Sequence, residues 1–141
     1  MTPSATKQAA GFVLFERGPE GRRYLLLRNS RHRTWGFPKG HQNKDEDLPT
    51  CARRELAEET SITDIRIFDD FQRVVRYRVR APSGSWEKIV TYYLAEKTGG
   101  DVRLSDEHDE MVWAPKADAR KRLDFDDLRR ILDDADAHPT D

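Results

Sequence analysis

One helix with acidic side chains on its inward face constrains this chain more than any other feature. Residues Leu48–Thr60 contain strong helix formers and no glycine, which predicts a helix over that range. Asp47 is placed to cap its start, and Pro49 falls in the first turn, where a missing N–H costs little. The face expected to be buried is defined by four residues: Leu48, Cys51, Ala52 and Leu56.

Three carboxylates crowd the same side of this helix. Glu55 lies inside the apolar arc, Glu59 points the same way, and Glu58 lies at the edge of the arc. A solvated acidic helix with an Arg54–Glu58 pair is the ordinary alternative, but that arrangement would place the acids outward. An inward carboxylate needs a partner. The pattern therefore favours a divalent metal, and Mg²⁺ is the cation that typically bridges carboxylates to substrate phosphates.

The residues before the helix extend this pattern into a long motif. The stretch from Gly40 to Ile62 resembles the signature of the Nudix hydrolases, G-x5-E-x7-R-E-U-x-E-E-x-G-U, where U is aliphatic. The matching residues are Gly40, Glu46, Arg54, Glu55, Leu56, Glu58, Glu59 and Ile62. Ser61 departs from the family glycine, and Asp45 stands where many members have glycine. A glycine at position 61 would ease a left-handed turn, at which another residue costs about 1 kcal/mol.

The resemblance implies a fold, a cofactor and a set of site residues. The expected fold is α/β, an α/β/α sandwich with a mixed β-sheet, and the expected cofactor is Mg²⁺ or Mn²⁺. The implied metal ligands are the Gly40 carbonyl, Glu55, Glu58, Glu59 and Glu107. Arg54 is implied to orient a glutamate, and the proton acceptor for the attacking water is left open among Glu58, Glu59 and Glu107.

Segments outside the motif resemble one branch of the family, the asymmetrical diadenosine tetraphosphate hydrolases. These segments are Trp35–His41, Lys88–Glu96 and Leu104–Trp113. The substrate-contacting residues that the likeness implies are Lys39, His41, Tyr77, Lys88 and Tyr92. The lysines suit phosphate oxygens, Tyr77 matches a phosphate-contacting position, and Tyr92 matches a position that stacks on adenine. Without the likeness, the lysines would be read as surface residues, and a strand tyrosine is usually a core residue.

The reaction that the resemblance implies is the hydrolysis of diadenosine tetraphosphate to ATP and AMP by a metal-activated water. One alternative is a Nudix enzyme for another polyphosphate: a nucleoside triphosphate, a diphosphoinositol polyphosphate or a 5′-triphosphorylated RNA. A different class of function is a non-catalytic nucleotide-binding module. Such a module would be expected to lose the acidic residues, and this chain keeps all of them.

The composition limits the classes of binding partner and the cellular compartment that we expect. The chain has 141 residues, which predicts a single domain, 1–141, with its core at about 8–137. Its 25 basic and 26 acidic side chains offer no general attraction to duplex nucleic acid, so the expected partner is a small dinucleoside polyphosphate. Cys51 is the only cysteine, Met1–Ala10 lacks a signal-peptide core, and no segment is long and apolar enough to span a membrane. A cytoplasmic protein is expected, and the sequence does not indicate an oligomeric state.

Alternation and helical periodicity predict the remaining elements. The predicted strands are Gln8–Glu16, Arg23–Arg28, Asp64–Ile67, Phe71–Arg80, Trp86–Glu96 and Met111–Ala114. The predicted further helices are Pro115–Leu123 and Asp126–Ala137.

Overall fold

A seven-stranded mixed sheet forms the centre of the molecule in the computed structural model, which describes residues 5–140. The strands are β1 (Ala5–Gly18), β2 (Gly21–Asn29), β3 (Trp35–Gly36), β4 (Lys39–His41), β5 (Ile65–Ala81), β6 (Gly84–Lys97) and β7 (His108–Ala114). Their order is β3-β2-β1-β6-β5, with β4 paired to β1 and β7 to β2. Residues 1–4 and 141 lie outside the described residues. The predicted domain 1–141 and the expectation on Met1–Ala10 therefore fall partly outside the structure.

The middle of the central pair of strands, Ala9–Phe15 of β1 and Ile89–Ala95 of β6, is largely buried on both faces. β1 and β6 run parallel, with Lys7 opposite Lys88 and Val13 opposite Leu94, whereas the other strand pairs are antiparallel. Successive β1 side chains are apolar on both sides, as expected for a strand covered on both faces. Two core clusters result, one on each side of the sheet.

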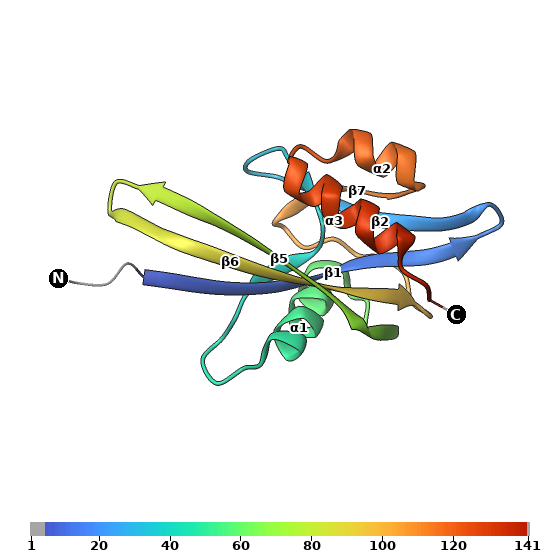
Figure 1. The fold of residues 1–141 in the computed structure, drawn as a ribbon, viewed down its shortest axis with the longest axis horizontal. Coiled ribbons are helices and arrows are strands. Elements are labelled where there is room, and N and C mark those ends of the chain that lie inside the picture. The colour runs from blue at the N-terminus through green and yellow to red at the C-terminus, as the bar shows by residue number, and fades with distance from the viewer. Residues whose placement is uncertain (1–4, 141) are drawn as a thin grey trace.

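Helices cover the two faces of the sheet (Figure 1). α1 (Leu48–Thr60) packs on one face, where Cys51, Ala52 and Leu56 join a cluster with Phe12 and Leu25. α2 (Lys116–Arg122) and α3 (Asp126–Ala137) lie on the other, and α3 buries the residues Leu128, Ile131, Leu132 and Ala135 there. The predicted α/β/α sandwich with a mixed sheet is confirmed. No helix within residues 5–140 has the length and apolar character needed to cross a membrane.

The predicted helix Leu48–Thr60 is confirmed with the same bounds. Asp47 caps it, because its carboxylate accepts a hydrogen bond from the Thr50 N–H at 2.8 Å. Ser61 ends it in the left-handed conformation with φ 67°, and Asp45 has φ 66°. Both departures from the glycine pattern therefore lie at positions that favour glycine.

Two details differ from the sequence prediction. The segment Lys39–His41, which lies outside the predicted strands, forms β4 and pairs with Ala9–Gly11 of β1. Gly11 permits this approach, because a Cβ there would overlap the Pro38 carbonyl. The predicted strands Asp64–Ile67 and Phe71–Arg80 merge into the single β5, which has an irregularity between Phe68 and Gln72.

One end of the sheet extends beyond the helices. The β5–β6 hairpin and the start of β1 project from the body, away from α1, α2 and α3 (Figure 1). The turn of this hairpin is tight, with Ala81 opposite Gly84. Its two faces carry different side chains, because strand residues alternate in direction.

Candidate active site

Arg54 joins the motif loop to the acidic helix. Its Nε and Nη2 donate to the two carboxylate oxygens of Glu46 at 2.7 and 3.0 Å. Its Nη1 donates to Glu55 at 2.9 Å and to Glu58 at 3.2 Å, and Nη2 also donates to the His41 carbonyl at 2.8 Å. The guanidinium therefore fixes the loop and holds Glu55 in place, and the implied role of Arg54 in orienting a glutamate for catalysis stays a prediction.

Glu46 anchors this arrangement as an ionised carboxylate. The Arg54 hydrogen bonds, followed by one from the Asn43 N–H, lower the pKa of Glu46 to about 2. Both carboxylate oxygens of Glu46 therefore accept hydrogen bonds from Arg54. We assign Glu46 a structural role in holding the loop.

Gly40 brings the loop into contact with the helix. A Cβ at this position would overlap the carboxylate of Glu55, so only glycine allows this approach. The Gly40 carbonyl, a predicted metal ligand, accepts a weak hydrogen bond from the Cys51 thiol at 3.4 Å. A carbonyl oxygen has a second lone pair, so this contact is compatible with a further ligand.

Glu59 is the only buried carboxylate among the described residues. Its side chain is almost fully buried, with 2% of the residue exposed, and its Oε2 has no hydrogen-bond partner among the described residues. Burial, together with the nearby charges of Glu55 and Glu107, raises the pKa of Glu59 to about 8, while Lys39 opposes the shift. Burial likewise raises the pKa of Glu55. A cation bound next to these buried carboxylates is expected to stabilise their ionised form.

The donor set fits a hard divalent cation. Glu55, Glu58 and Glu59 present oxygen atoms from one helix, and the orphaned Oε2 of Glu59 is a buried acceptor without a donor. Across residues 5–140, however, no three His, Cys, Asp or Glu side chains converge closely enough to form a finished metal cluster. Arg54 holds Glu55 and Glu58 toward itself. The predicted ligand set therefore stays a prediction.

A loop from the other end of the chain closes over the end of α1. The Arg103 and Ser105 N–H groups donate to the carbonyls of Thr60 and Glu59, at 2.8 and 3.1 Å. Glu107, exposed, is near enough to raise the pKa values of Glu55 and Glu59 by its charge. These contacts place the loop beside the acidic face of the helix.

His108 is a site residue that the sequence reasoning did not select. Its Nε2 lies 3.5 Å from Glu59 Oε1, its buried Nδ1 has no hydrogen-bond partner within residues 5–140, and burial lowers its pKa. His108 directly follows Glu107 in the sequence, and this adjacency could have identified it as a site residue. It places an imidazole ring beside the buried carboxylate of Glu59.

Basic side chains gather on the neighbouring strands. Lys88 of β6 lies opposite both Lys7 of β1 and Tyr77 of β5, and its ammonium is 5.9 Å from the Tyr77 ring centroid. Burial and the charges of Lys39 and Lys7 lower the pKa of Lys88 to about 8. Burial, followed by the charges of Lys88, Lys39 and Lys7, also lowers the pKa of His41. Four of the predicted substrate contacts (Lys39, His41, Tyr77 and Lys88) thus form one group.

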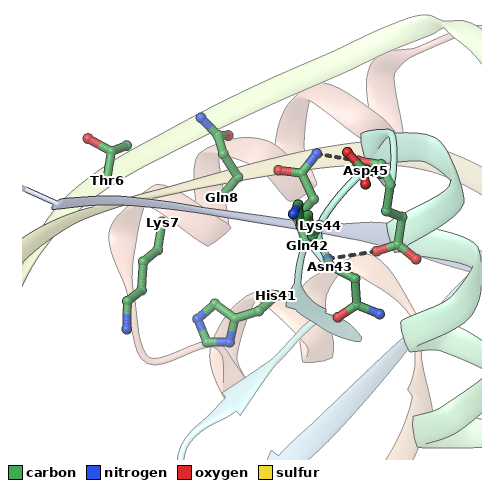
Figure 2. A pocket seen from close by; sticks show the side chains of 9 residues that line it. Thr6, Lys7, Gln8, His41, Gln42, Asn43, Lys44 and Asp45 are labelled. Carbon is green, nitrogen blue, oxygen red and sulfur yellow. Dashed lines mark hydrogen bonds between the residues drawn. The ribbon is translucent and has the colours of Figure 1, made fainter.

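An open depression of about 620 Å³ adjoins this group. Its wall is formed by β1 residues from Thr6 to Gln8 and by the loop from His41 to Glu46. Figure 2 shows Lys7 and His41 extending on one side of β1, whereas Thr6 and Gln8 point to the other. The sequence reasoning did not select Lys7. Its alignment with Lys88 depends on the parallel register of β1 and β6, which the sequence does not reveal.

Tyr92 corrects one prediction. It was expected to stack on a base, but only 1% of it is exposed, and its ring packs edge-on against Phe37 with centroids 5.6 Å apart. Tyr92 belongs to the core beneath the site. Tyr77, by contrast, is 41% exposed.

A comparison with protein families matches residues 6–135 to the NUDIX domain. This chain therefore belongs to the Nudix family. A similar protein is the bis(5′-nucleosyl)-tetraphosphatase (asymmetrical) of Caenorhabditis elegans, 33% identical over 131 residues, covering 89% of this chain and 91% of that protein. An 8-oxo-(d)GTP phosphatase of Mycolicibacterium smegmatis is 34% identical over 136 residues and covers 90% of this chain, which spans only 40% of that protein. The solved binary complex of C. elegans Ap4A hydrolase has a TM-score of 0.84 at 32% identity, covering 93% of this chain and 96% of that one.

Proposed function

We propose that this protein hydrolyses dinucleoside polyphosphates, with diadenosine tetraphosphate cleaved to ATP and AMP. The observation that carries the proposal is the buried carboxylate of Glu59, whose Oε2 has no hydrogen-bond partner among the described residues, beside a group of cations on β1, β4 and β6. An acidic metal-binding side next to a basic phosphate-binding side is what hydrolysis of a phosphoanhydride requires. The likeness to asymmetrical tetraphosphatases along nearly their full length supports the choice of substrate.

The proposed cofactor is Mg²⁺ or Mn²⁺. Glu55, Glu58 and Glu59 would hold it, together with the Gly40 carbonyl and Glu107. When bound, such an ion lowers the pKa of a coordinated water and stabilises charge on the departing phosphate. The fit rests on the oxygen-only donor set and on the unpaired Oε2 of Glu59.

The chain's own residues supply positioning and proton transfer. Lys39 and Lys88 attract the polyphosphate as point charges, and Tyr77 lies beside Lys88 on the same sheet face. Arg54 fixes the position of Glu55 and keeps the Gly40 loop against α1. A carboxylate of Glu58, Glu59 or Glu107 accepts the proton of the attacking water. This arrangement lowers the barrier through orientation and electrostatics.

Product analysis tests this function. The purified protein is incubated with Mg²⁺ and a panel of diadenosine tri-, tetra- and pentaphosphates, nucleoside triphosphates and a 5′-triphosphorylated RNA, and the products are separated by chromatography. We expect ATP and AMP from the tetraphosphate, at a higher kcat/KM than any other substrate of the panel gives. Equal or faster turnover of a nucleoside triphosphate would overturn the choice of substrate.

A second candidate is the hydrolysis of a nucleoside triphosphate. The 34% identity to the M. smegmatis 8-oxo-(d)GTP phosphatase favours it, and the same acidic and basic groups would serve. The panel should therefore include 8-oxo-dGTP, with release of a nucleoside monophosphate as the readout. We further propose a small-molecule substrate and a cytoplasmic setting, in which the free, buried Cys51 stays reduced.

A further inference from the structure

The projecting end of the sheet carries an aromatic residue next to the proposed phosphate-binding cations. Trp86 of β6 lies two residues from Lys88, so both side chains stand on the same sheet face. Across the hairpin, Tyr77 is paired with Lys88 and Val79 with Trp86. These residues form two adjacent rows that lead away from the acidic site.

Lys7 connects the two rows. It lies opposite Lys88 in the parallel β1–β6 pairing, and its Nζ is 4.4 Å from the centroid of the Trp86 ring. Lys7 also lines the depression next to His41, with both side chains on one side of β1 (Figure 2). One ammonium thus lies between the phosphate-binding cations and an indole ring.

The setting of Trp86 is unusual for a core tryptophan. The ring is only partly buried, and this end of the sheet projects beyond the three helices (Figure 1). A partly exposed indole on a sheet face beside cations is a surface on which a nucleobase can stack. A Lys ammonium over an indole ring also holds that ring in place through a cation–π contact.

We propose that Lys7 and Trp86 form a distal nucleoside subsite, in which Lys7 contacts the polyphosphate and the Trp86 indole stacks on the base farthest from the acidic helix. The subsite rests on the proposed function, because it needs a substrate with a nucleoside at each end. It makes this hairpin face a determinant of specificity for dinucleoside over mononucleoside polyphosphates.

The test compares two substrates that differ only in the distal nucleoside: diadenosine tetraphosphate and adenosine 5′-tetraphosphate. In Trp86→Ala, kcat/KM for the dinucleotide should fall about 10-fold, in line with the loss of one stacked base, and should stay unchanged for the mononucleotide. Trp86→Phe, which keeps an aromatic face, should restore most of the activity. In Lys7→Ala, kcat/KM should fall for both substrates, because both retain the polyphosphate.

Matched controls come from the opposite face of the same hairpin. Val74 is 47% exposed on β5, and Arg78 is an exposed cation two residues before Arg80. Strand alternation places both on the face away from Tyr77. Val74→Ala and Arg78→Ala should leave both kcat/KM values within about 2-fold of wild type. Losses equal to those of the site-face variants would overturn the proposal.

A binding measurement covers the case in which Trp86→Ala disturbs the hairpin. A non-hydrolysable, methylene-bridged diadenosine tetraphosphate is titrated into the wild-type protein and into Trp86→Phe, and tryptophan fluorescence is recorded. A change in emission that is lost in Trp86→Phe, with binding still detected by calorimetry, supports the subsite. An identical change in both proteins overturns it.

The outcomes separate the subsite from the proposed function. Wild-type turnover of the dinucleotide to ATP and AMP, with equal kcat/KM in Trp86→Ala, overturns the subsite alone. Absence of that turnover in the wild type overturns both.

Discussion

At the scale of single residues, the buried carboxylate of Glu59 shows how the site is set up for chemistry at a cost to stability. An acid without a donor in an apolar setting is expensive to ionise. Here burial and two neighbouring acids raise the pKa of Glu59 to about 8. A cation next to it would reverse this penalty, which links metal binding to folding stability.

The pH dependence of stability should reveal Glu59. Its folded-state pKa lies above the ordinary value of 4.5, so its contribution to stability is complete below about pH 4.5 and is lost as the pH rises to about 8. In metal-free buffer, the free energy of unfolding measured by urea denaturation should therefore decrease from pH 5 to pH 8. In Glu59→Gln this decrease should be smaller. The same slope in both proteins would show that Glu59 does not titrate in this range.

Lys88 gives a second titration that can be measured. Burial, with two lysines nearby, lowers its pKa to about 8, so the free protein loses this charge as the pH rises past 8. The kcat/KM for a polyphosphate should fall over pH 7.5–9.5, because a neutral amine binds phosphate weakly. Lys88→Arg should abolish most of this alkaline fall, since a guanidinium stays charged. A profile that does not differ between the two proteins would remove Lys88 from substrate binding.

The sequence predicted most of the site's residue types but not their depth. The motif spacing placed Glu55 and Glu59 on the inward face of the helix, and Glu59 is indeed buried. The burial of Tyr92 depends on Phe37, which comes from a segment far away in the chain. Lys7 was missed because its neighbour Lys88 is brought to it by a long-range parallel pairing.

At the scale of elements, α1 is the best predicted part of the molecule because its signals are local. Asp47 caps the start, and the acidic and apolar positions follow the helical period. β4, in contrast, has three residues and pairs with β1, so no local periodicity could have revealed it. The merged β5 was also missed, because the irregularity between Phe68 and Gln72 interrupts the alternation on which strand prediction depends.

The end of α1 offers a test of stability without a change in the site. Ser61 adopts φ 67°, a conformation that glycine enters without a steric penalty. Ser61→Gly should raise the free energy of unfolding by up to about 1 kcal/mol, with kcat unchanged. Thermal and urea denaturation measure the gain. A lower stability would show that the greater freedom of glycine in the unfolded chain outweighs the relief of strain.

The contact between β4 and α1 should be intolerant of a single methyl group. Gly40→Ala would place a Cβ where the Glu55 carboxylate lies, so either the loop or the carboxylate must move. We expect a loss of kcat/KM of at least about 100-fold, because small displacements of catalytic groups are costly. Gly36→Ala serves as a control, since a Cβ there meets only the end of a leucine side chain at 3.8 Å. Full activity in Gly40→Ala would contradict the role given to this contact.

At the scale of the whole molecule, the acidic and the basic side chains of the site come from different elements and meet beside one part of the sheet. α1 supplies carboxylates from one face, while β1, β4 and β6 supply cations at the adjoining strands. The sandwich with a mixed sheet followed from the motif and from the order of strands and helices. The strand order, with β1 and β6 parallel at the centre, could not be read from the sequence, because it depends on contacts between distant segments.

Acid should weaken the whole fold. Hydrogen bonds from partners in the folded protein lower the pKa values of Glu46, Asp47, Asp70 and Asp109. Such groups contribute stability above their ordinary pKa values, and it is lost as the pH falls through the lower folded values. The free energy of unfolding should therefore drop from pH 4.5 toward pH 2. Glu46→Gln, which removes one of these groups, should flatten this drop.

The most direct test of the central claim is a crystal soaked in Mn²⁺, examined at a wavelength that gives anomalous scattering from manganese. We expect an anomalous peak within about 2.3 Å of oxygen atoms from Glu55, Glu58 and Glu59. Crystals with no such peak beside α1, and with Glu59 Oε2 still without a ligand or donor, would contradict the assignment of this helix as the metal-binding element.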